Sequence, residues 1–235
     1  ILFCLSILSF AMAEDEFFFE SKTIEYIDNE NLIKARGNVK ITSSNGLNIF
    51  ADESNYFKVN NKLFLKGNIQ IIDKNRGIII ESDKVEYDKK NESIISNSET
   101  KIKVNNNYII DTYNLKYLRS KKTLSSDQKT TLTDKFKNKI ETSDFIYLTD
   151  KKKFRSKNLR LIDKDSNTYI ADNSFIDLSN NKIAAKDIKI YFSKNGSFGE
   201  HSRLKGNYMV SSNDSTVISK GVFTTCKPND KCPPW

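Results

Sequence analysis

Apolar and polar residues alternate along the chain in short segments that recur about every thirty residues. The clearest segments are 35–41 (ARGNVKI), 65–71 (LKGNIQI), 98–104 (SETKIKV), 156–162 (SKNLRLI) and 185–191 (AKDIKIY). Strict alternation is typical of a strand with one buried face and one face in water. The positions that we predict to face inward are Val39, Ile41, Ile69, Ile71, Ile80, Ile102, Val104, Leu159, Leu161, Ile188 and Ile190.

The tyrosines reveal a second series of segments in step with the first. They stand at the ends of five similar segments, and a sixth copy carries an aspartate in the same place: Tyr26, Tyr56, Tyr87, Tyr117, Tyr147 and Asp177. The residue two positions earlier is apolar in every copy except Ser54. Polar turn residues such as 28–31, 89–91 and 179–181 separate the two series. Six copies in register indicate a repeat protein.

Each repeat therefore reads as a strand, a turn and a second strand, with no helical periodicity between them. This pattern predicts an all-β fold and excludes βαβ architectures. It leaves a β-solenoid or a long antiparallel sandwich as the arrangement of the repeats.

The first thirteen residues, ILFCLSILSFAMA, are apolar and lack charge. They match the end of a secretory signal peptide, with cleavage expected between Ala13 and Glu14. The run is too short to span a bilayer as a helix, which needs roughly 20 apolar residues. We expect an exported protein whose printed sequence lacks the start of its signal peptide.

The formal net charge of the whole chain is +8. Such an excess of Lys and Arg serves either as a solvated exterior or as an attraction for an anionic partner, such as a phosphorylated lipid or a membrane surface. Export makes nucleic acid the weakest of these partners, and we predict none.

Candidate catalytic chemistry is sparse. His201 is the only histidine, and together with two cysteines of the tail it does not complete a four-ligand zinc site. The sequence contains no G-x-S-x-G, P-loop or H-E-x-x-H motif. We predict no enzyme, no cofactor and no metal. The rival from another class is an exported β-solenoid that binds or cleaves polysaccharide, which requires carboxylates and aromatic side chains clustered on one face.

The repeats 35–41 and 65–71, within an array that follows a signal peptide, resemble the OstA-like periplasmic domain of the lipopolysaccharide-transport proteins LptA and LptD. The resemblance covers about residues 20–210. It implies an elongated open β-jellyroll of about six strand–turn–strand repeats in two antiparallel sheets. It also implies an apolar trough that receives the acyl chains of lipopolysaccharide, and terminal strands that pair with an LptA-like bridge protein. The inward positions named above either line this trough or pack a closed core.

The tail differs from the repeats, because all three prolines and the only tryptophan fall within 226–235 (CKPNDKCPPW). It resembles the segment through which LptD proteins pass from the periplasmic domain into an outer-membrane barrel. The expected divisions are a signal peptide at 1–13, the OstA-like domain at 14–210 and a junction at 211–235. The resemblance implies a location at the periplasmic face of the outer membrane and an LptE-like lipoprotein partner, reached through a barrel that lies outside the printed sequence. Within the tail, Cys226 and Cys232 bond either to each other or to cysteines of that barrel.

Overall fold

The computed structural model describes residues 17–29, 31–105 and 107–227, and these residues form twenty β-strands. The first ten are β1 (Phe17–Glu20), β2 (Thr23–Ile27), β3 (Leu32–Ser43), β4 (Leu47–Phe57), β5 (Lys62–Asp73), β6 (Ile78–Asp88), β7 (Ser93–Ser96), β8 (Thr100–Val104), β9 (Tyr108–Thr112) and β10 (Leu115–Leu118). The other ten are β11 (Thr123–Ser126), β12 (Thr130–Asp134), β13 (Lys139–Thr142), β14 (Asp144–Leu148), β15 (Lys153–Ile162), β16 (Thr168–Asp177), β17 (Lys182–Tyr191), β18 (Arg203–Ser211), β19 (Thr216–Ser219) and β20 (Val222–Thr224). Among the described residues, no helix could cross a membrane.

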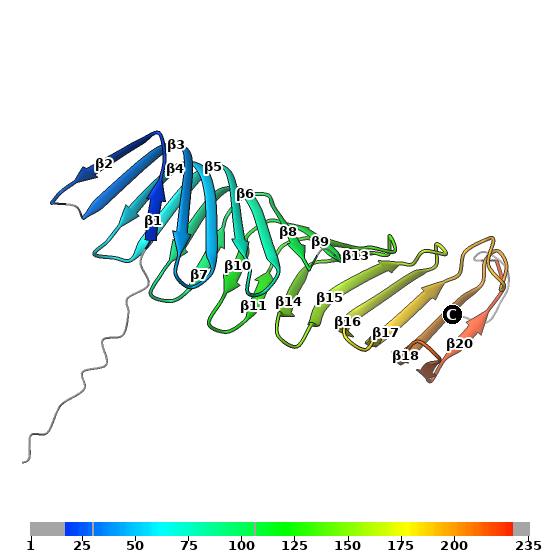
Figure 1. Ribbon diagram of the computed structural model, residues 1–235. Coiled ribbons are helices and arrows are strands. Elements are labelled where there is room, and N and C mark those ends of the chain that lie inside the picture. Colours follow the sequence, from blue (N-terminus) through cyan, green and yellow to red (C-terminus); the bar gives the residue numbers. More distant parts are fainter. Residues whose placement is uncertain (1–16, 30, 106, 228–235) are drawn as a thin grey trace, which may run out of the picture.

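All strand pairings are antiparallel, and they join the strands into one elongated array that runs from β1 and β2 at one end to β19 and β20 at the other (Figure 1). Long strands such as β3 to β6 and β15 to β18 pair along two separate stretches of their length. Between them, β7, β10, β11 and β14 continue one stretch, while β8, β9, β12 and β13 continue the other. The array is thus two sheets that share their long strands.

We call these two layers the tyrosine sheet and the aliphatic sheet. The tyrosine sheet holds the stretches with Tyr56, Tyr87, Tyr117 and Tyr147, and it includes β2 and β19. The aliphatic sheet holds the stretches with residues such as Ile41, and it includes β1 and β20. The line along which the long strands pass from one sheet to the other is the crease.

The crease is built from residues that tolerate a left-handed backbone. Gly37 and Asn38 have φ values of 76° and 53°, and Gly67 and Asn68 have values of 76° and 45°. The register between neighbouring strands shifts at both places. A side chain on Cβ disfavours this conformation, so glycine and asparagine are the residues expected there. The G-N pair of the repeats therefore marks the bend between the sheets.

On the inner side of the crease the side chains are small and carry hydroxyl groups. Ser82 and Ser96 share a hydrogen bond of 2.8 Å, and Thr112 and Thr130 share one of 2.7 Å. All four are buried. The two sheets meet there at a narrow angle that leaves little room, and the paired hydroxyl groups satisfy one another's polar atoms.

The turns at the outer margins of the sheets also stack on one another. On the tyrosine sheet, the Lys89 N–H donates to the Asn61 carbonyl at 2.8 Å, and the Arg119 N–H donates to the Glu92 carbonyl at 2.9 Å. On the aliphatic sheet, the Asn105 N–H donates to the Gly77 carbonyl at 2.8 Å. We call these two rows of stacked turns the rims.

The all-β prediction is confirmed, and the fold is an elongated open β-jellyroll of antiparallel strands. Two features differ from the sequence-based picture. Between residues 93 and 148 each repeat divides into four short strands, because the strand pairing is interrupted where the chain crosses the crease. The boundary expected at residue 210 falls inside the array, because β19 and β20 pair with β18. The expected signal peptide and its cleavage site at Ala13 and Glu14 lie outside the described residues.

Candidate binding groove

The C-terminal half of the array contains a groove of about 650 Å³ between the two sheets. Its walls come from both sheets, and its apolar lining consists of Tyr108, Leu132, Phe136, Ile140, Leu159, Leu161, Tyr169, Ile176, Leu178, Ile183, Ile188 and Met209. Five of these side chains are only partly buried, so the core is open to solvent here: Tyr108, Leu161, Tyr169, Leu178 and Ile183. A groove of this size and lining suits an apolar ligand.

The rim of the aliphatic sheet beside the groove is held by two copies of one turn, DKFKN at 134–138 and DKDSN at 163–167. In the first, the Asp134 carboxylate accepts the Phe136 and Asn138 N–H groups at 2.8 and 2.9 Å. The side-chain oxygen of Asn138 accepts the Lys164 N–H of the next turn at 2.9 Å. The Asp163 carboxylate accepts the Asn167 N–H in the same way at 2.8 Å. The carboxylates of Asp134 and Asp163 therefore stabilise their own turns.

The tyrosines of the groove remain neutral. Burial, followed by the charge of Asp163, raises the pKa of Tyr169 to about 12. The Tyr169 hydroxyl donates to the Asp163 carboxylate at 3.2 Å. Burial also raises the pKa of Tyr108. Tyr108 and Tyr169 therefore add no charge to the groove at physiological pH.

A second, polar hollow of about 850 Å³ adjoins the groove, and the two share Asn107, Tyr108 and Leu178. We call it the basic recess, because its basic residues are Lys74, Arg76, Arg119, Lys122 and Lys152, against the acids Glu92 and Asp150. Several of these charges already form ion pairs, but Lys74 and Lys152 are exposed. The excess of positive charge suits an anionic group beside an apolar one.

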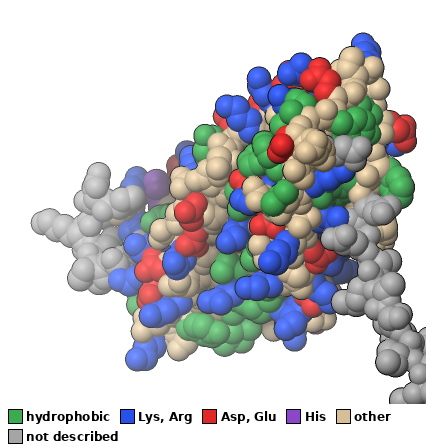
Figure 2. Space-filling model, turned by 90° about the vertical axis from the view of Figure 1, so that its left-hand side faces the viewer, with side chains coloured by type: hydrophobic (Ala, Val, Ile, Leu, Met, Phe, Trp, Pro, Cys, Tyr) green, Lys and Arg blue, Asp and Glu red, His purple; other side chains and the backbone are tan. Residues whose placement is uncertain are grey.

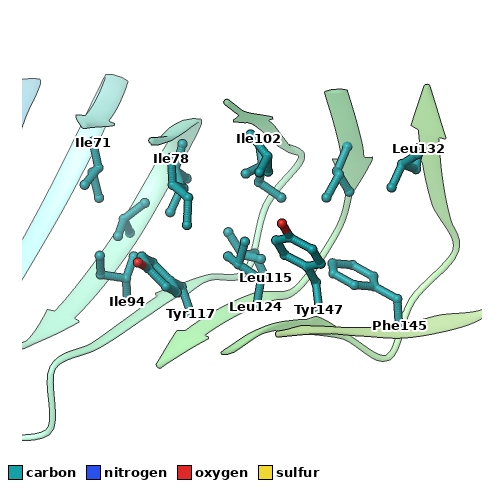
Figure 3. Close-up of a cluster of buried hydrophobic side chains, with 14 of the residues drawn as sticks. Ile71, Ile78, Ile94, Ile102, Leu115, Tyr117, Leu124, Leu132, Phe145 and Tyr147 are labelled. Carbon is teal, nitrogen blue, oxygen red and sulfur yellow. The ribbon is translucent and has the colours of Figure 1, made fainter. Parts of the chain in front are cut away.

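The N-terminal half of the array is closed by packed side chains. The hydroxyl-bearing ring of Tyr117 projects from the tyrosine sheet toward the side of Ile78 on the aliphatic sheet (Figure 3). Tyr87 and Tyr117 are fully buried, and Tyr56 is 7% exposed. The tyrosines that mark the repeat therefore fill the space between the sheets in this half of the array.

A buried ion pair joins the two rims of this closed half. It lies across the gap between the rims, which we call the mouth. Arg119 follows β10 on the rim of the tyrosine sheet, and Asp73 ends β5 on the rim of the aliphatic sheet. The Arg119 Nε donates to Asp73 Oδ2 at 3.0 Å, and both side chains are 1% exposed. We call Arg119, Asp73 and their partner Tyr117, whose hydroxyl donates to the same oxygen at 2.8 Å, the clasp. No local sequence pattern indicates this ion pair, because Asp73 and Arg119 stand 46 positions apart.

The predicted inward residues divide between the two halves. Leu159, Leu161 and Ile188 line the groove. The other eight are at most 3% exposed and do not line it: Val39, Ile41, Ile69, Ile71, Ile80, Ile102, Val104 and Ile190. The alternation correctly places all eleven inside the protein, but lipid binding by them stays a prediction. Groove residues that the sequence did not single out include Leu132 and Ile140 on the aliphatic sheet and Ile176, Ile183 and Met209 on the tyrosine sheet.

Other candidate residues lie away from the groove. His201 lies in the segment between β17 and β18 and is not among the groove-lining residues. No group of three or more His, Cys, Asp or Glu residues that could hold a metal occurs in the part of the chain that the structure describes. Cys226 is disulfide-bonded. Its expected partner Cys232 lies outside the described residues, so their pairing stays a prediction.

The fold and the groove define an elongated antiparallel β-array with an apolar groove between its two sheets. No family model matches the sequence, and no curated protein matches it. Among solved structures, the chain is similar to LptH of Pseudomonas aeruginosa, described as the LptA homologous periplasmic component of the conserved lipopolysaccharide transport device. The identity is 11%, the match covers 61% of this chain and 83% of that chain, and the TM-score is 0.28. At this level the likeness carries no functional weight, so the function has to follow from the chain's own residues.

Proposed function

We propose that this protein is a non-enzymatic carrier that shelters the acyl chains of lipopolysaccharide during transport to the outer membrane. The observation that carries the proposal is the apolar groove between the two sheets, with partly buried side chains such as Leu161 and Tyr169 at its surface. Its support from the sequence is the array of repeats that resembles the LptA and LptD proteins.

The physical reason is the cost of exposing hydrocarbon to water. Each methylene costs roughly 0.8 kcal/mol, so a chain of about a dozen carbons costs on the order of 10 kcal/mol. A few surface contacts cannot offset this cost, whereas a groove lined by about a dozen apolar side chains on two facing sheets can. The neighbouring basic recess, with Lys74 and Lys152, suits the phosphate groups of the same lipid.

The finer proposal is the periplasmic domain of an LptD protein, exported by the segment 1–13. In this proposal the array, which extends past the expected boundary at 210 to include β19 and β20, passes lipopolysaccharide through the junction that follows it to an outer-membrane barrel. Its partners are an LptA-like bridge protein, which pairs with a terminal strand, and an LptE-like lipoprotein. The alternative is a soluble LptA-type bridge. Sequencing the gene beyond Trp235 separates them, since the LptD proposal requires a barrel-sized β continuation.

The polysaccharide-binding alternative has less support. The acids beside the groove, Asp134 and Asp163, accept hydrogen bonds from their own turns, and Asp177 does the same with Ser179 and Asn180. Carboxylates bound in this way hold loops in place and are poorly suited to act on a sugar.

Photocrosslinking in a cell that makes lipopolysaccharide tests the proposal. A photoreactive amino acid at Leu161 should crosslink to lipopolysaccharide, because this side chain lines the groove. Ile146 is the matched control, since it is also apolar but lies on an outer face and is 43% exposed. Absence of lipid at Leu161, or equal crosslinking at Ile146, would refute the carrier function.

A further inference from the structure

Four hydrogen bonds join the two rims at the clasp. Arg119 donates to Asp73 at 3.0 Å through Nε and to the Asn45 carbonyl at 3.1 Å through Nη2. The Tyr117 hydroxyl reaches Asp73 at 2.8 Å, and Arg76 Nη2 donates to the Arg119 carbonyl at 3.2 Å. Asn45, Asp73 and Arg76 belong to the aliphatic sheet, and the other two residues belong to the tyrosine sheet. These four hydrogen bonds therefore hold the two rims together and close the mouth at this point.

The clasp is also anchored along its own rim. Arg119 Nη1 contacts Glu92 Oε1 at 3.1 Å, and Arg76 Nη1 contacts Asp73 Oδ2 at 3.1 Å. The Arg119 side chain thus uses all three of its nitrogens, and it is the largest fully buried side chain among the described residues. A buried arginine with this set of partners has one favoured position, so the clasp holds the two rims at a fixed separation.

The corresponding positions along the groove cannot form such a bond. The Leu178 N–H donates to the Lys152 carbonyl as the Arg119 N–H does to that of Glu92, so Leu178 occupies the same place in its repeat. Its side chain carries no donor. At the Thr149 turn the side-chain hydroxyl donates to the Lys122 carbonyl on its own rim. The closed half and the open half of the array therefore differ in the residues that face the mouth.

We propose that the clasp is the end wall of the groove and confines acyl chains to the C-terminal half of the array. The inference rests on the carrier function proposed above and specifies where in the array the ligand lies. On the aliphatic sheet the groove is lined from Tyr108 on β9 to Ile188 on β17, which is five strand-to-strand steps. At about 4.8 Å per step this gives a site roughly 24 Å long. Beyond Arg119 the packed tyrosines leave no room for a chain.

Labelling of the unmodified protein tests where the ligand lies. The protein is mixed with a palmitic acid that carries a diazirine, irradiated, and digested, and the labelled peptides are identified by mass spectrometry. Label is expected on peptides with Leu161 and Met209 and absent from those with Ile71 and Ile94. Label on both sets would overturn the end wall while leaving the carrier function intact. Label on neither set would refute the carrier function itself.

A double variant tests whether the clasp is the wall. Asp73→Ser together with Arg119→Leu removes both charges, and it introduces the residue types that the chain already has at the equivalent Ser43 and Leu178. Label should then spread to the peptides with Ile71 and Ile94. The matched control is Glu141→Ser with Arg160→Leu, which removes an exposed ion pair of 3.3 Å on the outer face of the groove strands.

The control should leave the labelling pattern unchanged, and circular dichroism should confirm that both variants fold. Labelling that stays confined to the groove in the folded double variant would overturn the role of the clasp. Should the double variant fail to fold, the labelling of the unmodified protein still decides whether the chains end at Arg119.

Discussion

In the clasp, the side chains of Asp73 and Arg119 form a buried ion pair between the two rims. A buried ion pair is weak evidence for net stability, because desolvation offsets much of the attraction between the charges. What the pair Asp73 and Arg119 supplies is geometry, since four hydrogen bonds fix one rim against the other. Removal of only one partner would leave the other charge buried and unpaired.

The pH dependence of stability should report on Asp73. Burial alone would raise the pKa of this carboxyl group, but hydrogen bonds from Arg119 and Tyr117 and the charges of Arg119 and Arg76 lower it overall. A carboxyl group whose pKa is lower in the folded state contributes stability above its unfolded pKa of about 3.9, and this contribution is lost as the pH falls through the folded value.

We therefore expect the free energy of unfolding to fall between about pH 5 and pH 2 more steeply in the unmodified protein than in the variant Asp73→Ser with Arg119→Leu. Urea unfolding at several pH values, followed by far-UV circular dichroism, measures this difference. Other carboxylates with lowered pKa, such as Glu81 and Glu141, titrate in both proteins and cancel in the comparison. Parallel pH profiles of the two proteins would contradict the assignment.

At the scale of residues, the sequence predicts which side chains face inward but not what lies opposite them. Alternation predicts that both Ile71 and Leu161 face inward. Ile71 is packed in the closed core, whereas Leu161 lines the groove. The tyrosines mark the repeat in the sequence, and in the structure they fill the space between the sheets. The difference depends on contacts between strands far apart in the chain, which a local pattern does not contain.

At the scale of elements, the crease explains why the repeat contains a G-N pair. Gly67 lies in the left-handed region with φ 76°, and a Cβ placed on it would overlap the Asp52 carboxylate. Asn68 donates to the same carboxylate at 2.8 Å. The sequence motif predicted the strand correctly and could not predict its bend, because alternation continues on both sides of the corner.

The variant Gly67→Ala should lower the free energy of unfolding by about 1–2 kcal/mol or more, because alanine is strained in this conformation and its Cβ displaces Asp52. Gly196→Ala is the matched control. Gly196 is outside the left-handed region, and the nearest atom to its added Cβ is the Ser193 carbonyl oxygen at 3.3 Å. The control should change stability by at most about 0.5 kcal/mol. Equal effects of the two variants in urea unfolding would show that the bend does not require glycine.

At the scale of the whole molecule, the array ends in strands that pair on one side only. β1 and β2 each pair with β3 alone, and β19 and β20 each pair with β18 alone, among the described residues. Apolar side chains are exposed at both ends, including Phe18 and Tyr26 at one and Val217 at the other. Figure 2, which faces the N-terminal end, shows hydrophobic side chains at the surface between Lys and Arg side chains.

Unpaired edges that no proline or bulge protects are suited to strand addition by a partner. Under the proposed function, an LptA-like bridge protein adds a strand at the N-terminal end, where β1 and β2 pair with no described strand other than β3. The groove begins only beyond Arg119, so a lipid arriving at that end would have to pass along the mouth of the closed half to reach it. The positions of the edge and the groove therefore predict separate effects on docking and on lipid binding.

The pair of substitutions Phe18→Lys and Tyr26→Lys should weaken association with the bridge protein by roughly tenfold, equivalent to about 1.4 kcal/mol, because it adds charge to the docking edge. Ile146→Lys is the matched control, since Ile146 is exposed on an outer face away from both ends. Sedimentation of mixtures over a range of concentrations measures the association, and diazirine labelling of the groove should be the same in all three proteins. Loss of groove labelling in the edge variant, or equal weakening by Ile146→Lys, would show that docking and lipid binding do not use separate surfaces.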